Sequence, residues 1–245
     1  MPFCYTPGAS DMIAALSYMA LGFLLGMRHA TDADHVIAVS TIVTRQRSVR
    51  GGVLTGAVWG LGHTLTIIVV GGAIIVFRIV IPPVLGLTME MTVALMLVGL
   101  GVWNLREVRA PNDHGHREDQ TPQAWLDRRL GTLATYQLGR PLVVGLVHGL
   151  AGSAAVALLV LATINDARWA MAYLLLFGVG TIVGMMLITA TLAAPLAYAS
   201  RRSTRVGHHL RVASGLLSVG IGLFLVYQIG FVDGLFTGDP TWTPH

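Results

Sequence analysis

The segment HATDADH brings two histidines and two aspartates together within seven residues: His29, Asp32, Asp34 and His35. Apolar runs flank this segment on both sides, over residues 12–27 and 36–43. An ionisable side chain at membrane depth is costly unless it is paired, hydrated or bound to a metal, so such residues are functional candidates. Imidazole and carboxylate groups together suit a divalent transition metal. The segment therefore predicts a metal site within a membrane, and the alternative is an interfacial loop with solvated charges.

Two more histidines stand alone in apolar surroundings and extend the candidate site. His63 lies in the segment LGHT, within a predicted helix whose small residues allow close helix packing. His148 lies in a second apolar run. For each, the alternative is a core histidine bonded to a backbone carbonyl, but three separate histidine positions at membrane depth favour a metal ligand or a proton relay. We expect the remaining histidines to be solvated loop or surface residues: His114, His116, His208, His209 and His245.

The composition indicates a membrane protein and excludes several classes. Hydrophobic residues make up 54% of the 245 residues and charged residues only 11%, which is too apolar for a soluble domain of this size. The single cysteine, Cys4, excludes an intramolecular disulfide and a cysteine-based zinc cluster. Every basic residue is arginine, so the lysine that a nucleotide-binding P-loop requires is absent. The arginines are spread over separate loops, which argues against nucleic-acid binding.

Six apolar segments must position these residues, and they predict an all-α, polytopic membrane protein. The first segment is too long for a hydrocarbon core of about 30 Å, since it would extend about 50 Å as one helix. We therefore expect the first helix to be broken or kinked between Gly26 and Asp34, with an unwound turn that lines a cavity. The alternative is a seventh span, with a hairpin at the histidine segment. The six predicted helices cover residues 12–44, 53–77, 85–107, 142–164, 169–198 and 209–231.

The arginines predict the orientation of these spans. With six spans, the loops after the first, third and fifth helices lie on one side of the membrane, and they hold most of the arginines. On the opposite side, the loops hold Arg78 and Arg168. Because basic residues mark the cytoplasmic side, we expect a multi-pass protein of the cell inner (plasma) membrane with both termini outside.

Short glycine-rich strings recur along the chain at nearly constant spacing. The string GMRHA at 26–30 returns as GLVHG at 145–149, WGLG at 59–62 returns as FGVG at 177–180, and VGLG at 98–101 returns as VGIG at 219–222. Three matches in one order predict a duplication, and an odd number of spans per copy inverts the second copy. We expect two inverted three-helix repeats in residues 1–107 and 141–245, joined by a cytoplasmic loop at 108–140. In the second repeat, His148 matches His29, whereas Ala151, Ser153 and Ala154 stand opposite Asp32, Asp34 and His35.

The histidine motifs resemble those of the nickel/cobalt transporter family. HATDADH resembles the H-x4-D-H signature of that family, and LGHT resembles its second histidine motif. This resemblance implies transport of Ni2+ or Co2+ across a cytoplasmic membrane, with metal recognition by His29, Asp34, His35 and His63. The segment GLVHGLAGS, at residues 145–153, is similar to the short, urease-accessory-type nickel permeases of the same superfamily.

These observations predict a secondary transporter for Ni2+, with Co2+ as the second candidate substrate. An inside-negative potential favours uptake of a divalent ion by about 4.6 kcal/mol per 100 mV, whereas efflux needs coupling to protons. We expect no enzymatic activity and no resident cofactor, and we expect the metal ion and the lipid bilayer as partners. The alternatives are an intramembrane metal-dependent enzyme and a membrane subunit without transport of its own. The predicted metal ligands are His29, Asp32, Asp34, His35, His63 and His148.

Overall fold

The computed structural model describes residues 9–44, 48–77, 81–109, 133–150, 164 and 166–242. All regular structure in these ranges is helical, which confirms the predicted all-α fold. The helices are α1 (Ala9–His29), α2 (Ala33–Val43), α3 (Val49–Phe77), α4 (Pro83–Arg109), α6 (Leu133–His148), α8 (Ala167–Arg202) and α9 (Thr204–Tyr227), followed by the short π-helix η2 (Gln228–Val232).

Four of the described helices contain stretches long and apolar enough to cross a membrane: Val49–Phe77, Pro83–Val108, Ala167–Leu196 and Arg205–Val232. On α3, Leu61, Leu65 and Val69 recur at one-turn spacing and are each more than half exposed, as expected of side chains that face lipid. His63 and Ile67 lie on the buried face of the same helix. The predicted polytopic membrane fold is thus confirmed.

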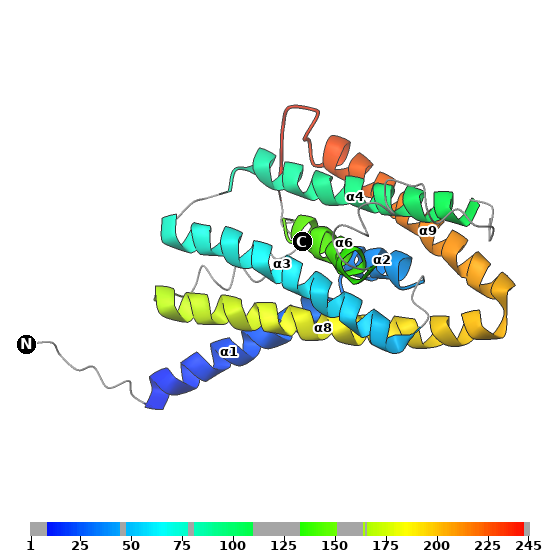
Figure 1. Ribbon diagram of the computed structural model, residues 1–245. Helices are drawn as coiled ribbons and strands as arrows, with labels where there is room; N and C mark the ends of the chain where they lie inside the picture. Colours follow the sequence, from blue (N-terminus) through cyan, green and yellow to red (C-terminus); the bar gives the residue numbers. More distant parts are fainter. Residues whose placement is uncertain are drawn as a thin grey trace, which may run out of the picture.

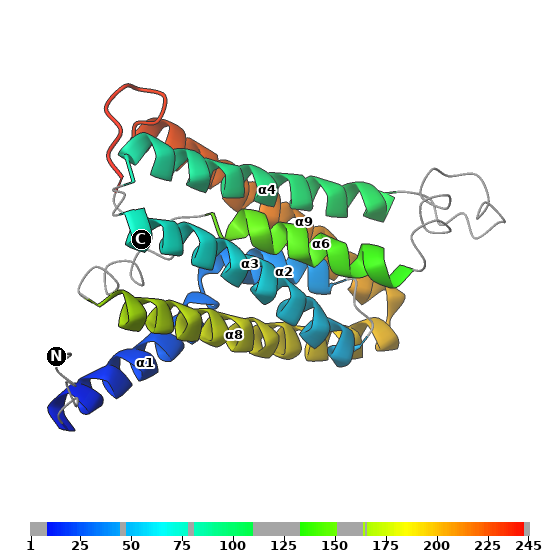
Figure 2. The same cartoon turned by 60° about the vertical axis from the view of Figure 1, so that its left-hand side comes forward.

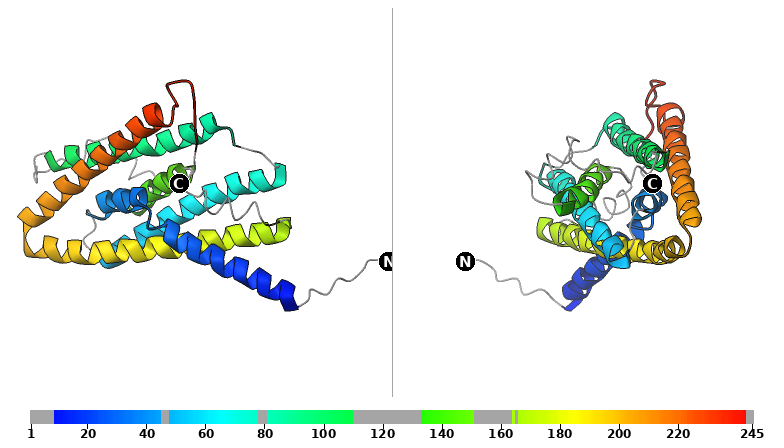
Figure 3. Two further views of the ribbon diagram at one scale, coloured as in Figure 1. Left: turned by 180° about the vertical axis from the view of Figure 1, so that it is seen from behind. Right: turned by 45° about the vertical axis from the view of Figure 1, so that its right-hand side comes forward.

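The long helices enclose the short central ones. α3 runs alongside α8, and α4 runs alongside α9 (Figure 1). α2 and α6 lie between these two pairs, as the turned views in Figure 2 and Figure 3 show. α2 contacts α3, α4, α8 and α9, and α6 contacts α3 and α4, while α1 packs against α8. Protein therefore encloses one face of α2, whose buried residues are His35, Ile37, Ala38, Val39, Thr41 and Val43.

The first predicted helix is broken, as expected, and forms α1 and α2. The backbone N–H groups of Thr31 and Asp32 donate to the carbonyls of Arg28 and His29, three residues back, so α1 closes with a tight turn. Asp32 then takes an extended backbone conformation at the N-cap position of α2. Its carboxylate makes no capping bond and contacts His29 instead. With 11 residues, α2 is too short to cross a bilayer alone, which disfavours the seven-span alternative.

The two halves of the chain contact each other through equivalent positions. α3 and α8 run in opposite directions, and so do α4 and α9 (Figure 1). A Cβ atom at Gly26 would overlap the carbonyl oxygen of Phe177, and a Cβ atom at Gly145 would overlap that of Trp59. The two glycines match in the recurring strings, and so do the two aromatic residues. Paired close approaches of this kind are expected of the predicted inverted repeats, and the duplication itself stays a prediction.

One helix begins earlier than predicted. α6 begins at Leu133, so residues 133–140 of the predicted loop are helical. The sequence places the start after Pro141, because a proline cannot donate to the carbonyl four residues back, yet α6 continues through it. Membrane helices tolerate proline where neighbouring groups satisfy the freed backbone. The predicted span 142–164 extends beyond α6, and its residues 151–163 lie outside the described residues.

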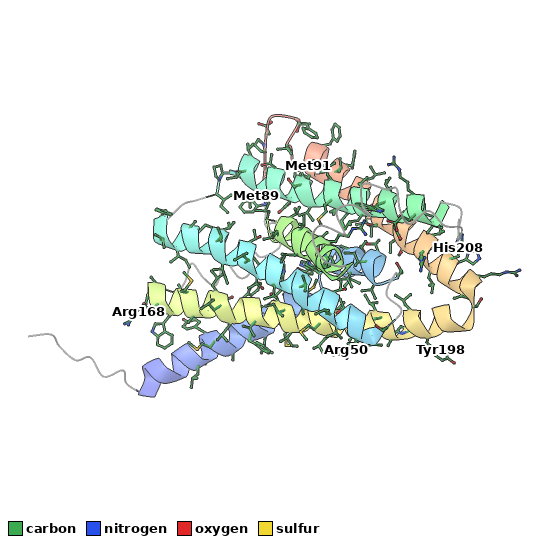
Figure 4. All side chains as sticks on the ribbon, in the orientation of Figure 1. Arg50, Met89, Met91, Arg168, Tyr198 and His208 are labelled. Carbon is green, nitrogen blue, oxygen red and sulfur yellow. The ribbon has the colours of Figure 1, made fainter. Side chains whose placement is uncertain are left out.

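Charged and polar residues mark the two ends of the bundle. Figure 4 shows Arg168 at one end and Arg50, Tyr198 and His208 at the other. This distribution agrees with the six-span prediction, in which Arg50 and Arg168 face opposite sides of the membrane. Which end faces the cytoplasm stays a prediction from the positions of the arginines.

Candidate metal centre

Four buried histidines from four helices meet inside the bundle. His63 lies midway along α3, and His29 and His148 are the last residues of α1 and α6. His35 lies in the first turn of α2. Each of the four is at most 5% exposed. We call these histidines, together with the two aspartates of the HATDADH segment, the histidine cluster. It contains all six ligands predicted from the sequence.

His29 connects three other members of the cluster. Its Nδ1 atom lies 2.9 Å from Oδ2 of Asp32, and its Nε2 atom lies 2.9 Å from Nε2 of His63. The centroids of the His29 and His35 rings are 4.7 Å apart. One nitrogen from each of His29, His35 and His63 lies within 4.8 Å of the other two. These three imidazoles form the first group that can share one metal ion.

Asp34 joins His35 to His148 in a second group. Its Oδ1 atom lies 3.1 Å from Nδ1 of His35, and its Oδ2 atom lies 3.0 Å from Nε2 of His148. The ring centroids of the two histidines are 4.2 Å apart. The side chain of Asp34 is 18% exposed, against 39% for Asp32. His35 belongs to both groups. It therefore links His29 and His63, in the first half of the chain, to His148 in the second half.

The two carboxylates determine which imidazole nitrogens keep a lone pair. Each aspartate accepts a hydrogen bond from Nδ1 of one histidine, His29 or His35, and Asp34 also accepts one from Nε2 of His148. With these protons assigned, Nε2 of His29 accepts from Nε2 of His63. Three buried nitrogens then have no hydrogen-bond partner among the described residues: His35 Nε2, His63 Nδ1 and His148 Nδ1. Because unpaired buried polar atoms are rare, these three nitrogens are candidates for binding a ligand.

The helix ends favour a cation at this site. The carboxyl ends of α1 and α6 meet at the cluster, at His29 and His148. Such an end carries roughly half an elementary negative charge, because its last carbonyls have no partner within the helix. Asp34 lies in the first turn of α2, where its charge offsets the positive amino end of that helix. Helix ends and carboxylates together give the cluster a negative field.

Sequence reasoning missed two aromatic rings that border the cluster. The ring centroid of Phe177 lies 5.5 Å from that of His29, and the centroid of Trp59 lies 5.7 Å from that of His148. Trp59 stands four residues before His63, so helical spacing on one face could have found it. For Phe177, the available signal is its match to Trp59 in the recurring strings.

The remaining predicted positions differ in their outcome. His148 lies beside His35 and Asp34. His208 and His209 are exposed, as predicted. The loop histidines, at 114 and 116, and Ser153 lie outside the described residues.

The fold and the cluster define a class: polytopic membrane proteins with a histidine and carboxylate site inside a helical bundle. The family described as cytochrome C biogenesis protein transmembrane region matches residues 67–224. The urease accessory protein UreH of Bacillus sp. (strain TB-90) is 33% identical over 226 residues, which are 92% of this chain and 97% of UreH. The chain therefore belongs to the family of this urease accessory protein and contains the transmembrane region that the matched family describes. The predicted kinship with urease-accessory-type membrane proteins is confirmed.

More distant similarity extends to two chloroplast proteins of Arabidopsis thaliana. FOR GROWTH AND FERTILITY 1 is 25% identical over 228 residues, and FOR GROWTH AND FERTILITY 2 is 24% identical over 226 residues. This similarity covers 88% of the present chain but 60% and 57% of the two chloroplast proteins. No solved structure matches the chain. The residues matched by the transmembrane family contain no cysteine, since Cys4 lies outside them, so that match carries no thiol chemistry to this protein.

Proposed function

We propose that this protein is a secondary transporter that moves Ni2+ across the cell membrane, with the histidine cluster as the site through which the ion passes. The observation that carries this proposal is the set of three buried imidazole nitrogens without a partner, on His35, His63 and His148. Neutral imidazole is a ligand for Ni2+, and two carboxylates offset the charge of a divalent ion. Carboxylates that accept from ligating imidazoles also fix ring orientation and raise ligand basicity.

The choice of Ni2+ among the metals that imidazole binds rests on similarity. Imidazole suits Zn2+, Cu2+, Fe2+ and Ni2+ alike. The histidine motifs resemble those of the nickel/cobalt transporter family, and the relative UreH is named as an accessory protein of urease. Co2+ is the second candidate substrate, because ligand type separates it little from Ni2+.

The two overlapping groups offer the ion a route. His29, His35 and His63 form the first stage, and Asp34, His35 and His148 form the second. An ion that keeps His35 as a ligand exchanges His29 and His63 for Asp34 and His148 without becoming fully hydrated. Uptake needs no nucleotide hydrolysis, because the membrane potential supplies about 4.6 kcal/mol per 100 mV for a divalent ion. The name of the Bacillus relative assigns it an accessory role for urease, and we propose that this protein acts as an accessory by supplying Ni2+.

Metal accumulation in cells tests this function. Cells that express the chain should accumulate radioactive Ni2+ above the level of cells with an empty vector, and unlabelled Co2+ should compete less well than unlabelled Ni2+. His29→Ala should abolish the accumulation but leave membrane insertion unchanged, because it removes a ligand and spares the apolar spans.

The matched control changes two histidines outside the cluster. His114→Ala combined with His116→Ala should accumulate Ni2+ as the wild type does. Loss of accumulation in this loop variant, together with its retention in His29→Ala, would show that the proposed site is wrong. Tight Ni2+ binding without any accumulation would instead favour a membrane subunit that does not transport.

A further inference from the structure

We propose that Phe177 and Trp59 are the two gates of this transporter, closing the histidine cluster from opposite ends of the bundle. This inference rests on the transport function proposed above and assigns roles to two residues that are not ligands. By a gate we mean a side chain that separates the cluster from one membrane face and must move before an ion passes.

Each aromatic ring covers a different group of the cluster. Phe177 packs against His29, in the first group, with 5.5 Å between ring centroids. Trp59 packs against His148, which belongs to the second group alone, at 5.7 Å, and it stacks at 6.5 Å on His35, which both groups share. Phe177 is 1% exposed and Trp59 is 0% exposed, so both rings exclude water from the imidazoles that they touch.

The two rings occupy equivalent positions in the two halves of the chain. Trp59 opens the string WGLG and Phe177 opens the matching string FGVG. Each has its carbonyl oxygen against a glycine at the equivalent place in the other half, Gly145 for Trp59 and Gly26 for Phe177. The same local contact is therefore built twice, once on α3 against α6 and once on α8 against α1.

Because α3 and α8 run in opposite directions, Trp59 and Phe177 lie toward opposite ends of the bundle. α3 and α8 lie side by side and run in opposite directions (Figure 1). Trp59 and Phe177 each lie about three turns from the start of their helix, so Trp59 is toward the end marked by Arg50 and Phe177 toward the end marked by Arg168 (Figure 4). His63 follows Trp59 by about one turn, which places the cluster between the rings.

Aromatic rings suit this role chemically. The negative face of a ring attracts a cation, so a gate of this kind excludes water without repelling the ion that must pass. Trp59 has a further property, because its buried Nε1 donor has no hydrogen-bond partner among the described residues. An indole N–H cannot bind a metal ion, but it can donate to a water molecule that rejoins the ion on leaving the second group.

Sidedness of labelling tests the proposal directly. In a Cys4→Ser background, Phe177→Cys and Trp59→Cys are treated with a membrane-impermeant thiol reagent, in spheroplasts and in inside-out vesicles. We expect Phe177→Cys to be labelled from the outside only and Trp59→Cys from the inside only. Leu174→Cys is the matched control, because Leu174 is 1% exposed, lies on α8 beside Phe177 and packs against Gly71, so it should be labelled from neither side.

A second pair of variants tests the same proposal if the first pair does not fold. Tyr173 and Thr55 also occupy equivalent positions, one turn further from the cluster along α8 and α3, and both are buried. Tyr173→Cys should be labelled from the outside and Thr55→Cys from the inside. Labelling of both gate positions from one side, or labelling of neither in variants that elute as folded protein, would overturn the proposal.

The labelling uses no nickel, so it separates this inference from the proposed function. If the two positions are labelled from opposite sides but the protein does not transport Ni2+, the proposed substrate is wrong and the proposed gates are supported. If the protein transports Ni2+ but both positions are labelled from the same side, the proposed gates are wrong and the proposed substrate is supported.

Discussion

At the scale of single residues, the two aspartates of the cluster have unequal tasks. Asp34 accepts hydrogen bonds from His35 and His148, which come from different halves of the chain. Asp32 contacts His29, and its side chain is twice as exposed. Asp34 therefore fixes two imidazole rings at once, whereas Asp32 orients one.

We predict that Asp34→Asn lowers Ni2+ affinity more than Asp32→Asn does. Asparagine keeps the shape of the side chain but loses its charge and one of its two acceptor oxygens, so only one of His35 and His148 keeps its acceptor. Loss of an orienting carboxylate typically reduces metal affinity roughly 10- to 100-fold. Titration calorimetry on the purified protein in detergent measures both variants, and a larger loss for Asp32→Asn would contradict this assignment.

A second prediction concerns the order of the two groups. His148→Ala leaves the first group of imidazoles intact, so Ni2+ should still bind, but transport should be lost because the ion has no second stage. His63→Ala removes a ligand of the first group and should lose both binding and transport. Calorimetry and transport assays on the same preparations separate these outcomes. Transport at the wild-type rate by His148→Ala would exclude the second group from the pathway.

At the scale of helices, the packing of α1 against α8 depends on Gly26, and the packing of α6 against α3 depends on Gly145. A Cβ atom at Gly26 or Gly145 would overlap a backbone carbonyl of the facing helix, which cannot move aside as a flexible side chain does. Small residues at such places let membrane helices approach closely. The cluster residues at the ends of α1 and α6 are held in place by these contacts.

We predict that Gly26→Ala and Gly145→Ala each destabilise the protein by about 1 to 3 kcal/mol, as overpacking does in a tight core. Gly99→Ala is the matched control, because nothing lies within 4 Å of the added Cβ atom on α4. It should be neutral or slightly stabilising, since alanine favours helix over glycine. Thermal melts followed by circular dichroism at constant detergent concentration compare the three variants. Equal melting temperatures for Gly26→Ala and Gly99→Ala would contradict the close approach.

The elements and the ligands differ in how well the sequence predicts them. Hydrophobic length predicts α3, α4, α8 and α9, and excess length predicts the break in the first helix, because both follow from bilayer thickness. The start of α6 is not predictable in this way, since a proline at position 141 inside a helix depends on its neighbours. The residue types are enough to predict the six ligands, but which of these ligands contact each other depends on the tertiary structure. That Asp34 contacts His148, far away in the sequence, follows only from the tertiary arrangement that brings the first turn of α2 to the end of α6.

At the scale of the whole molecule, the orientation in the membrane follows from the arginines. The prediction is that the loop between α4 and α6 faces the cytoplasm. A cysteine introduced as His114→Cys, in a Cys4→Ser background, should react with an impermeant thiol reagent in inside-out vesicles and not in spheroplasts. Reaction in spheroplasts alone would reverse the orientation and exchange the two faces assigned to the gates.

The central claim is that Ni2+ crosses the membrane through the histidine cluster, and flux into proteoliposomes of purified protein tests it most directly. A potassium diffusion potential, negative inside, drives the ion toward a metal-sensitive dye trapped in the lumen. Wild-type protein should give Ni2+ influx that disappears when the potential is collapsed, and His29→Ala, reconstituted to the same density, should give none. Absence of influx with correctly inserted wild-type protein, or equal influx with His29→Ala, would contradict the account.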